Sequence, residues 1–304
     1  MSDRTLITPG VYRDIPFREY RLWDAINKSS LDDLLDWSPK HCRYYQDHPK
    51  PNTPDLLTGR ALHTYILEPD KFDAEFIVAG QCEAVTGKGT RCRNGGSVII
   101  AGACWCKTHA PADGEPDPRA QLDADQLATV EAMGAAIKAD EMARRLVYTK
   151  GGDNELSLCW QDRETGLLCR ARLDMLRPTW QMIGDLKTTQ NASKAEFERS
   201  LGDWGYHRQA AFYLDGARAL GLDVPHFGLI PIEKKPPYGV ATYVVDDSAV
   251  EAGRTEIRAA LRAYAQCKST GDWWGYASQW ELIGLKPWQA KEIFKTHEAR
   301  EFTA

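Results

Sequence analysis

The sequence predicts an α/β fold in which a mixed β-sheet is flanked by helices. Segments with a helical spacing of apolar residues come first, segments that alternate apolar and polar residues follow, and helices and a second strand pair end the chain. Of the 304 residues, 43% are hydrophobic, which is enough for a sizeable core. We expect one domain over residues 1–304, with a small module inserted at residues 81–118.

The first part of the chain is expected to be helical. After an extended lead-in at 11–28, a pair of serines can cap a helix that ends near Trp37. Pro39 occupies a first-turn position and favours a second helix there. Apolar residues at three- and four-residue spacing predict longer helices at about 56–67 and 122–146.

Alternating residues predict the strands that follow. Residues 154–162 and 166–174 alternate well and are joined by a turn, and a third strand begins at Asp185. The remaining expected elements, in order, are helices at about 194–201 and 206–220, a strand pair around 235–237 and a helix at about 247–267.

Composition limits the classes of protein to be considered. No run of eighteen or more apolar residues exists, so we expect no membrane association through a helix, and the N-terminus lacks the apolar core of a signal peptide. We therefore expect a cytoplasmic protein, in which eight cysteines more often bind metal or stay free than form disulfides. A net charge of −5 argues mildly against a general nucleic-acid binder, although a carboxylate-rich metal site is itself negative.

The segment 167–189 predicts a metal-dependent site. It is expected to form two strands and a turn, and Asp185 and Lys187 then point to the same face of the second strand. If the turn is centred on 179–180, Asp174 lies directly across from Asp185. Two carboxylates and an ammonium group in one small space are costly unless a divalent cation joins them.

Other polar residues lie where such a site could use them. Glu155 opens the first strand of the sheet, and His63 lies on an upstream helix. Gln209 and Tyr213 are four residues apart on one helix and share a face. Each of these residues could instead have a purely structural role. His63 could be a hydrogen-bonded histidine within its helix, and Gln209 and Tyr213 could serve the surface and the core. Asp185 and Lys187 could form a surface ion pair.

Taken in order, these residues resemble the PD-(D/E)XK nuclease superfamily, and specifically the RecE-like exonucleases of phages and prophages, which are relatives of the RecB nuclease domain. The resemblance covers most of the chain except the cysteine-rich insertion. The motifs that carry it are TGRALH (58–63), ELSLCW (155–160), ARLDML (171–176), GDLKTT (184–189) and HRQAAFY (207–213). The resemblance implies a restriction-endonuclease-like fold.

The resemblance also implies roles for individual residues. Matching residues in that family hold one or two magnesium or manganese ions: His63, Asp174, Asp185 and the backbone carbonyl of Leu186. Lys187 matches the catalytic lysine, and Gln209 and Tyr213 match a substrate-positioning pair. Glu155 is a weaker match to a residue that supports the ligands or holds a second ion.

These roles agree with the chemistry of phosphodiester hydrolysis. Hard divalent cations prefer oxygen ligands, and magnesium keeps waters that a substrate phosphate can replace. A bound cation lowers the pKa of a coordinated water and neutralises charge on the phosphate. The ammonium group of Lys187 could orient that water and stabilise the developing negative charge.

The insertion is rich in cysteine and glycine and too short for a core of its own. Its spacing, Cys-x9-Cys followed by Cys-x2-His, looks like small zinc modules, and we predict a structural zinc ion. The preferred ligands are Cys82, Cys92, Cys106 and His109. Cys104 is the spare cysteine or replaces Cys106, and a loop of free thiols is the alternative.

The resemblance implies a divalent-metal-dependent DNA exonuclease of phage-type recombination. Its implied substrate is a linear duplex end, resected from 5′ to 3′, and its implied partners are DNA, a RecT-like single-strand annealing protein and further copies of itself in a ring. A repair or CRISPR-adaptation nuclease of the RecB type is one alternative. A catalytically inactive DNA-binding module is another, although it would predict a broken motif, and Asp174, Asp185 and Lys187 are all present.

Overall fold

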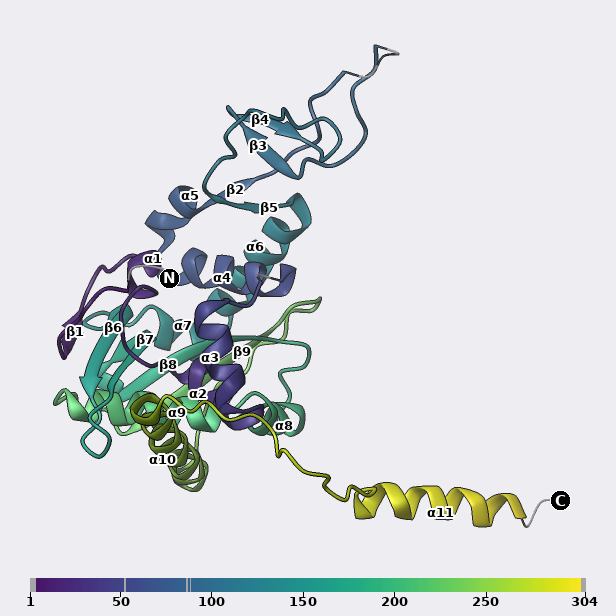
Figure 1. Cartoon of the computed structure of the whole chain (residues 1–304). Coiled ribbons are helices and arrows are strands. Elements are labelled where there is room, and N and C mark those ends of the chain that lie inside the picture. Colours follow the sequence, from purple (N-terminus) through teal and green to yellow (C-terminus); the bar gives the residue numbers. More distant parts are fainter. Residues whose placement is uncertain (1–3, 52, 86, 88, 302–304) are drawn as a thin grey trace.

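A six-stranded β-sheet lies at the centre of the fold, with helices on both of its faces (Figure 1). The computed structural model describes residues 4–51, 53–85, 87 and 89–301, and for residues 295–301 it describes the backbone alone. The mixed α/β architecture predicted from the sequence is confirmed.

The sheet is mostly antiparallel. Its strand order is β1-β6-β7-β8-β9-β10, and all neighbours pair antiparallel except β8 and β9, which run parallel. The parallel pair is connected by two helices, as a crossover requires. The strands are β1 (Gly10–Tyr12), β6 (Asp153–Gln161), β7 (Leu168–Arg177), β8 (Met182–Thr189), β9 (His226–Glu233) and β10 (Tyr243–Val244).

Two buried apolar clusters attach the helices to the two faces of the sheet. One cluster joins the sheet to α2 (Lys28–Asp36), α3 (Pro39–Asp47), α8 (Lys194–Asp203), α9 (Tyr206–Ala219) and α10 (Asp247–Thr270). The other joins it to α4 (Pro54–Leu67), α6 (Ala124–Ala139) and α7 (Glu141–Val147). The shorter helices are α1 (Phe17–Tyr20), η1 (Pro69–Lys71), α5 (Phe72–Glu75) and η2 (Pro178–Trp180).

The last helix, α11 (Pro287–Glu301), extends away from the rest of the chain (Figure 1). Among the described residues, no helix is both long and apolar enough to span a bilayer.

Side-chain caps define where the early helices begin. Asn27, rather than the serines that follow it, caps α2, because its side chain accepts a hydrogen bond from the amide of Ser30 at 3.2 Å. Ser38 caps α3 ahead of Pro39, and Thr53 caps α4. The capping site expected at Ser29 or Ser30 therefore lies two or three residues too late in the chain.

The helix expected at 122–146 is two helices, α6 and α7. Asp140 separates them, with an extended backbone conformation at φ −73° and ψ 125°. Its side chain accepts a hydrogen bond from the amide of Ala143 at 2.8 Å and so caps the second helix. Apolar spacing continues across this break, which is why periodicity alone could not reveal it.

The strand pair expected around 235–237 forms only in part. Tyr243 pairs with Leu229, and a single bridge joins Ile232 to Val240, but the ladder between these points is incomplete. Pro231 lies in the gap. Its carbonyl accepts a hydrogen bond from the amide of Ala241, but proline has no amide hydrogen to donate in the other direction.

The cysteine-rich segment projects from one end of the fold (Figure 1). It lies between β2 (Phe76–Val78) and β5 (Ala120–Leu122), which pair parallel to each other. Inside it, β3 (Val98–Ile100) and β4 (Ala103–Trp105) form a hairpin. The two-residue turn of this hairpin has positive φ at Ala101 and Gly102, which suits the twist of a tight hairpin.

Candidate functional site

Asp174 and Asp185 lie where two neighbouring strands separate. The antiparallel ladder of β7 and β8 ends at the pair Met175 and Gly184, one position before the two aspartates would face each other. This is the register expected from a turn centred on 179–180. Beyond that point β7 continues its pairing with β6 and β8 its pairing with β9, so the sheet opens between the two carboxylates.

The two carboxylate oxygens of Asp185 have different surroundings. The residue is 1% exposed, and its Oδ1 accepts a hydrogen bond from Gln209 Nε2 at 2.6 Å. Its buried Oδ2 accepts no hydrogen bond from the described residues, although the ammonium group of Lys187 contacts it. Burial and repulsion by Asp174 raise the pKa of Asp185 to about 6.

Asp174 is held in its ionised form by its surroundings. Its Oδ2 accepts a hydrogen bond from the amide of Leu186 at 2.8 Å and lies 3.4 Å from His63 Nδ1. Burial raises the pKa of Asp174, but attraction by His63 and Lys187 outweighs burial and lowers it.

His63 joins the two acidic strands to α4. Its Nε2 lies 3.0 Å from the carbonyl oxygen of Leu186, and its Nδ1 lies 3.8 Å from Glu155 Oε1. Burial lowers the pKa of His63, but the two nearby carboxylates, Asp174 first, raise it well above its usual value. The potential ligand atoms of His63, Glu155 and Asp174 all lie within 4.8 Å of one another, so this trio could hold a cation.

Glu155 is fixed by an arginine that sequence reasoning missed. Arg172 Nε donates to Glu155 Oε2 at 2.5 Å, and its Nη1 donates to the carbonyl of Ile15 at 2.7 Å. Glu155 has φ 50°, a conformation that costs about 1–3 kcal/mol for a residue with a side chain and persists only where other contacts impose it. The available signal was that Arg172 and Asp174 are two residues apart on one strand and so share a face.

Lys187 lies between Asp185 and an aromatic ring that was also missed. Its Nζ is 5.1 Å from the ring centroid of Tyr206. Burial lowers the pKa of Lys187, but Asp185 and Asp174 outweigh burial and raise it, so the group stays charged. Tyr206 precedes Gln209 by three residues on α9, and that shared helix face was the overlooked signal.

Tyr213, the other predicted member of the helix pair, is packed against the core. Its ring meets Phe227 edge-on, with 6.1 Å between the ring centroids. Burial raises the pKa of its hydroxyl well above the usual value. Only Gln209 of the predicted pair contacts the acidic residues directly, through Asp185.

A second cluster lies in the projecting segment and contains three cysteines and one histidine. The four potential ligand atoms lie within 4.8 Å of one another, on Cys82, Cys92, Cys106 and His109. His109 Nδ1 is 3.7 Å from Cys82 Sγ and 3.3 Å from Cys106 Sγ. A tetrahedral zinc ion would separate sulfur and nitrogen ligands by about 3.6 Å, which is close to both distances.

Two of the three cysteines, Cys82 and Cys106, have a lowered pKa and so favour the thiolate form that metals bind, whereas the pKa of Cys92 is raised. Burial raises the pKa of Cys106, but hydrogen bonds from the Asn94 side chain and from the backbone at 108 and 109 outweigh it and lower that pKa to about 6. Cys104 lies outside the cluster, and its Sγ accepts a hydrogen bond from the amide of Gly80 at 3.2 Å.

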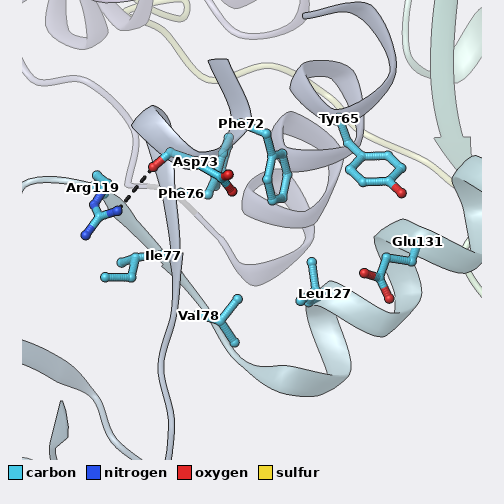
Figure 2. A pocket seen from close by; sticks show the side chains of 9 residues that line it. All are labelled: Tyr65, Phe72, Asp73, Phe76, Ile77, Val78, Arg119, Leu127 and Glu131. Carbon is cyan, nitrogen blue, oxygen red and sulfur yellow. Dashed lines mark hydrogen bonds between the residues drawn. The ribbon is translucent and has the colours of Figure 1, made fainter. Parts of the chain in front are cut away.

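The chain also has an open hollow of about 380 Å³ that contains none of the predicted site residues (Figure 2). Arg119 closes one side of it by donating to the carbonyl of Asp73 at 3.1 Å. Its walls come from α4, α5, β2 and α6 and are mainly apolar, as at Phe72, Val78 and Leu127. Its two carboxylates, Asp73 and Glu131, belong to no potential metal-ligand group among the described residues, unlike the acidic residues at the split strands.

Comparisons with known proteins agree with this choice of fold. Residues 35–285 match the family described as a PDDEXK-like domain of unknown function (DUF3799). The chain is also similar to a crystal structure from Eubacterium rectale described as a "Putative exonuclease", with a TM-score of 0.52 and 14% sequence identity. That similarity covers 90% of this chain and 97% of the other. No match was found among curated proteins.

Proposed function

This chain belongs to the family of PDDEXK-like domains (DUF3799), and we propose that it is a divalent-metal-dependent DNA exonuclease acting on the ends of linear duplexes. The observation that carries the proposal is the contact between the Lys187 ammonium group and the buried Oδ2 of Asp185, beside Asp174. In a PDDEXK-like fold, two acidic groups and one lysine where two strands separate can bind a divalent cation and stabilise the charge that develops during phosphodiester hydrolysis.

The donor set fits a hard divalent cation. Glu155, Asp174 and His63 have potential ligand atoms within 4.8 Å of one another, and Asp185 and the carbonyl of Leu186 would complete the set that holds magnesium or manganese. His63 would release a proton on binding, because only neutral imidazole is a ligand. The buried Oδ2 of Asp185 supports this, because it is paired with the Lys187 ammonium group but accepts no hydrogen bond from the described residues, and a carboxylate oxygen has lone pairs for a second cation. When bound, the cation would lower the pKa of a coordinated water and neutralise charge on the phosphate.

The chain's own residues would then orient and stabilise the reacting groups. The ammonium group of Lys187 stays charged and would stabilise negative charge that develops on the phosphate. Gln209 would keep Asp185 Oδ1 in place through its 2.6 Å hydrogen bond, so that Oδ2 stays beside Lys187 and the proposed cation site. Tyr206 would limit the movement of Lys187 by packing against it, and Tyr213 remains the predicted partner of Gln209 on the substrate side.

The finer features of the reaction rest on the resemblance to RecE-like enzymes. We propose digestion from 5′ to 3′, which leaves a 3′ single strand for recombination, by a ring of several copies working with a RecT-like annealing protein. Such an enzyme would act in the cytoplasm of a bacterial or phage-infected cell.

End-labelled linear duplex tests the proposal. With magnesium or manganese, the protein should release 5′ label before 3′ label, and Lys187→Ala should reduce the rate at least a hundredfold. Because this change also removes the ionic partner of the buried Asp185, thermal unfolding of the variant should confirm that it remains folded at the assay temperature. Lys268→Ala, at an exposed lysine on the last turn of α10, is the matched control and should keep the full rate. Undiminished digestion by Lys187→Ala would remove Lys187 from the mechanism, and no digestion by the unaltered protein would reject the function.

We also propose that Cys82, Cys92, Cys106 and His109 hold a structural zinc ion. The support is the distance agreement described above and the lack of a disulfide, since all eight cysteines are free. Purified protein should contain about one zinc per chain. Cys106→Ser should lose the metal, whereas Cys104→Ser should keep it, and the reverse pattern would exchange the two assignments.

A further inference from the structure

Trp204 has no aromatic partner among the side chains that the structure describes, and it lies close in the chain to the candidate site. We propose that its indole stacks on an unpaired nucleobase of the strand whose phosphate enters the site, an inference that rests on the proposed nuclease function. It adds a substrate feature to that function: recognition of a base that has left the duplex.

The position of Trp204 follows from a tight turn between two helices. Trp204 follows the last residue of α8, Gly205 takes a left-handed conformation at φ 60°, and α9 begins at Tyr206. The ring of Tyr206 packs on Lys187, and the next turn of α9 carries Gln209, which bonds Asp185. Trp204 is therefore only two residues from a side chain that contacts the candidate catalytic lysine.

The backbone of Trp204 is held while its side chain remains accessible. Its amide donates to the carbonyl of Ser200 at 3.1 Å, and Lys28 Nζ donates to its own carbonyl at 3.0 Å. The residue is nevertheless 67% exposed, and it belongs to neither of the two apolar clusters of the sheet. Core packing therefore does not account for an indole at this position. Because the backbone is already fixed, a ligand that binds the indole would lose little conformational entropy in ordering the chain.

The proposed substrate of the neighbouring site makes a nucleobase the occupant that suits this ring. The nearby ammonium groups of Lys28 and Lys187 already pair with Asp32 and Asp185, so the exposed indole, rather than free charge, supplies the contact. Stacking of one base on an aromatic side chain contributes about 1–3 kcal/mol. Bases inside a duplex already have both faces covered, so only an unpaired base offers a face to Trp204.

The test is binding of a single-stranded oligonucleotide that carries 2-aminopurine near one end, because stacking quenches its fluorescence. The full chain carries Lys187→Ala in every sample, so that the oligonucleotide stays intact. Adding Trp204→Ala should raise the Kd by about fivefold to a hundredfold and remove most of the quenching, which is the stacking contribution expressed as affinity. Trp204→Phe should keep most of both signals, because it retains a ring.

Trp280→Ala is the matched control, since Trp280 is a fully exposed tryptophan in the segment after α10. It should bind and quench like the parent protein. Unchanged binding and quenching in Trp204→Ala would overturn the inference, as would a parent protein that binds no single-stranded DNA. Either result is separate from the digestion of linear duplex by the unaltered protein, so the nuclease proposal could stand while this one failed.

Discussion

The close contact between α9 and α10 offers a way to disturb the candidate site without touching it. A Cβ added at Gly253 of α10 would lie 2.2 Å from the carbonyl oxygen of His207 and 2.5 Å from its carbonyl carbon. Both atoms belong to the backbone of the first turn of α9, so they cannot rotate away as a side chain would. Gly253→Ala should therefore push the start of α9 outward.

The size of the effect follows from these distances. Restoring ordinary contact requires a shift of about 1 Å, since carbon atoms pack at about 3.5–4.0 Å. Overpacking of this kind costs about 1–3 kcal/mol, and the better helix propensity of alanine returns about 1 kcal/mol. The displaced turn carries Tyr206 and is followed by Gln209, whose bond to Asp185 is 2.6 Å long. A 1 Å misplacement in a catalytic site can reduce the rate by about a hundredfold.

We therefore expect Gly253→Ala to lose about a hundredfold in digestion rate while losing at most about 2 kcal/mol of unfolding free energy. The assays are release of label from linear duplex and denaturant unfolding. Gly202→Ala is the control, because it also replaces a helical glycine, on α8, but a Cβ there would meet no atom within 4 Å. A Gly253→Ala protein with the parent rate would show that the first turn of α9 does not position the site.

Two further substitutions test the buried charges. Arg172→Met should cost about 1–3 kcal/mol in denaturant unfolding, because it removes the guanidinium group that bonds the partly buried carboxylate of Glu155, and an unchanged free energy of unfolding would contradict this. Asp162 accepts hydrogen bonds from Thr165 and pairs with Arg258; burial raises its pKa, but these contacts outweigh burial and lower it. A carboxylate whose pKa is lowered by folding stabilises the protein at pH values above its ordinary pKa of 3.8. This stabilisation is lost as the pH falls through the folded-state pKa. As the pH falls from 5 to 3, the free energy of unfolding should therefore decrease more for the parent protein than for Asp162→Asn. Equal decreases in the two proteins would refute the argument.

Much of the candidate site was predictable because strand geometry is regular. Two residues two apart on a strand share a face, so Asp185 and Lys187 had to lie together if the segment was extended. Centring the hairpin turn on 179–180 also predicted the register of β7 and β8, which the pairs from Met175 to Arg177 show. The site could be located from local sequence because both strands and their turn are contiguous in the chain.

The remaining features depend on contacts between distant segments. Nothing local indicates that the sheet opens between Asp174 and Asp185, because the opening depends on what each strand pairs with on its other side. Arg172 could be read as an ordinary strand residue until Glu155 was found beside it. The same is true of Gly253, whose lack of a side chain matters only because another helix lies against it.

The two candidate metal sites should respond differently to a chelator, because they differ in what surrounds them. The acidic site lies on a sheet that two large apolar clusters support, so the loss of a cation there removes an electrostatic contribution but not the fold. Around the cysteines, the buried cluster consists of Cys82, Cys92 and Cys106 with Ala84 packed against it. Even with the buried Ile99 and Ile100 of the hairpin, this is too little apolar surface to order a segment of this length. Chelation should therefore unfold the projecting segment alone. Added magnesium should then restore the charge balance at the acidic site, whereas only zinc should restore the projecting segment.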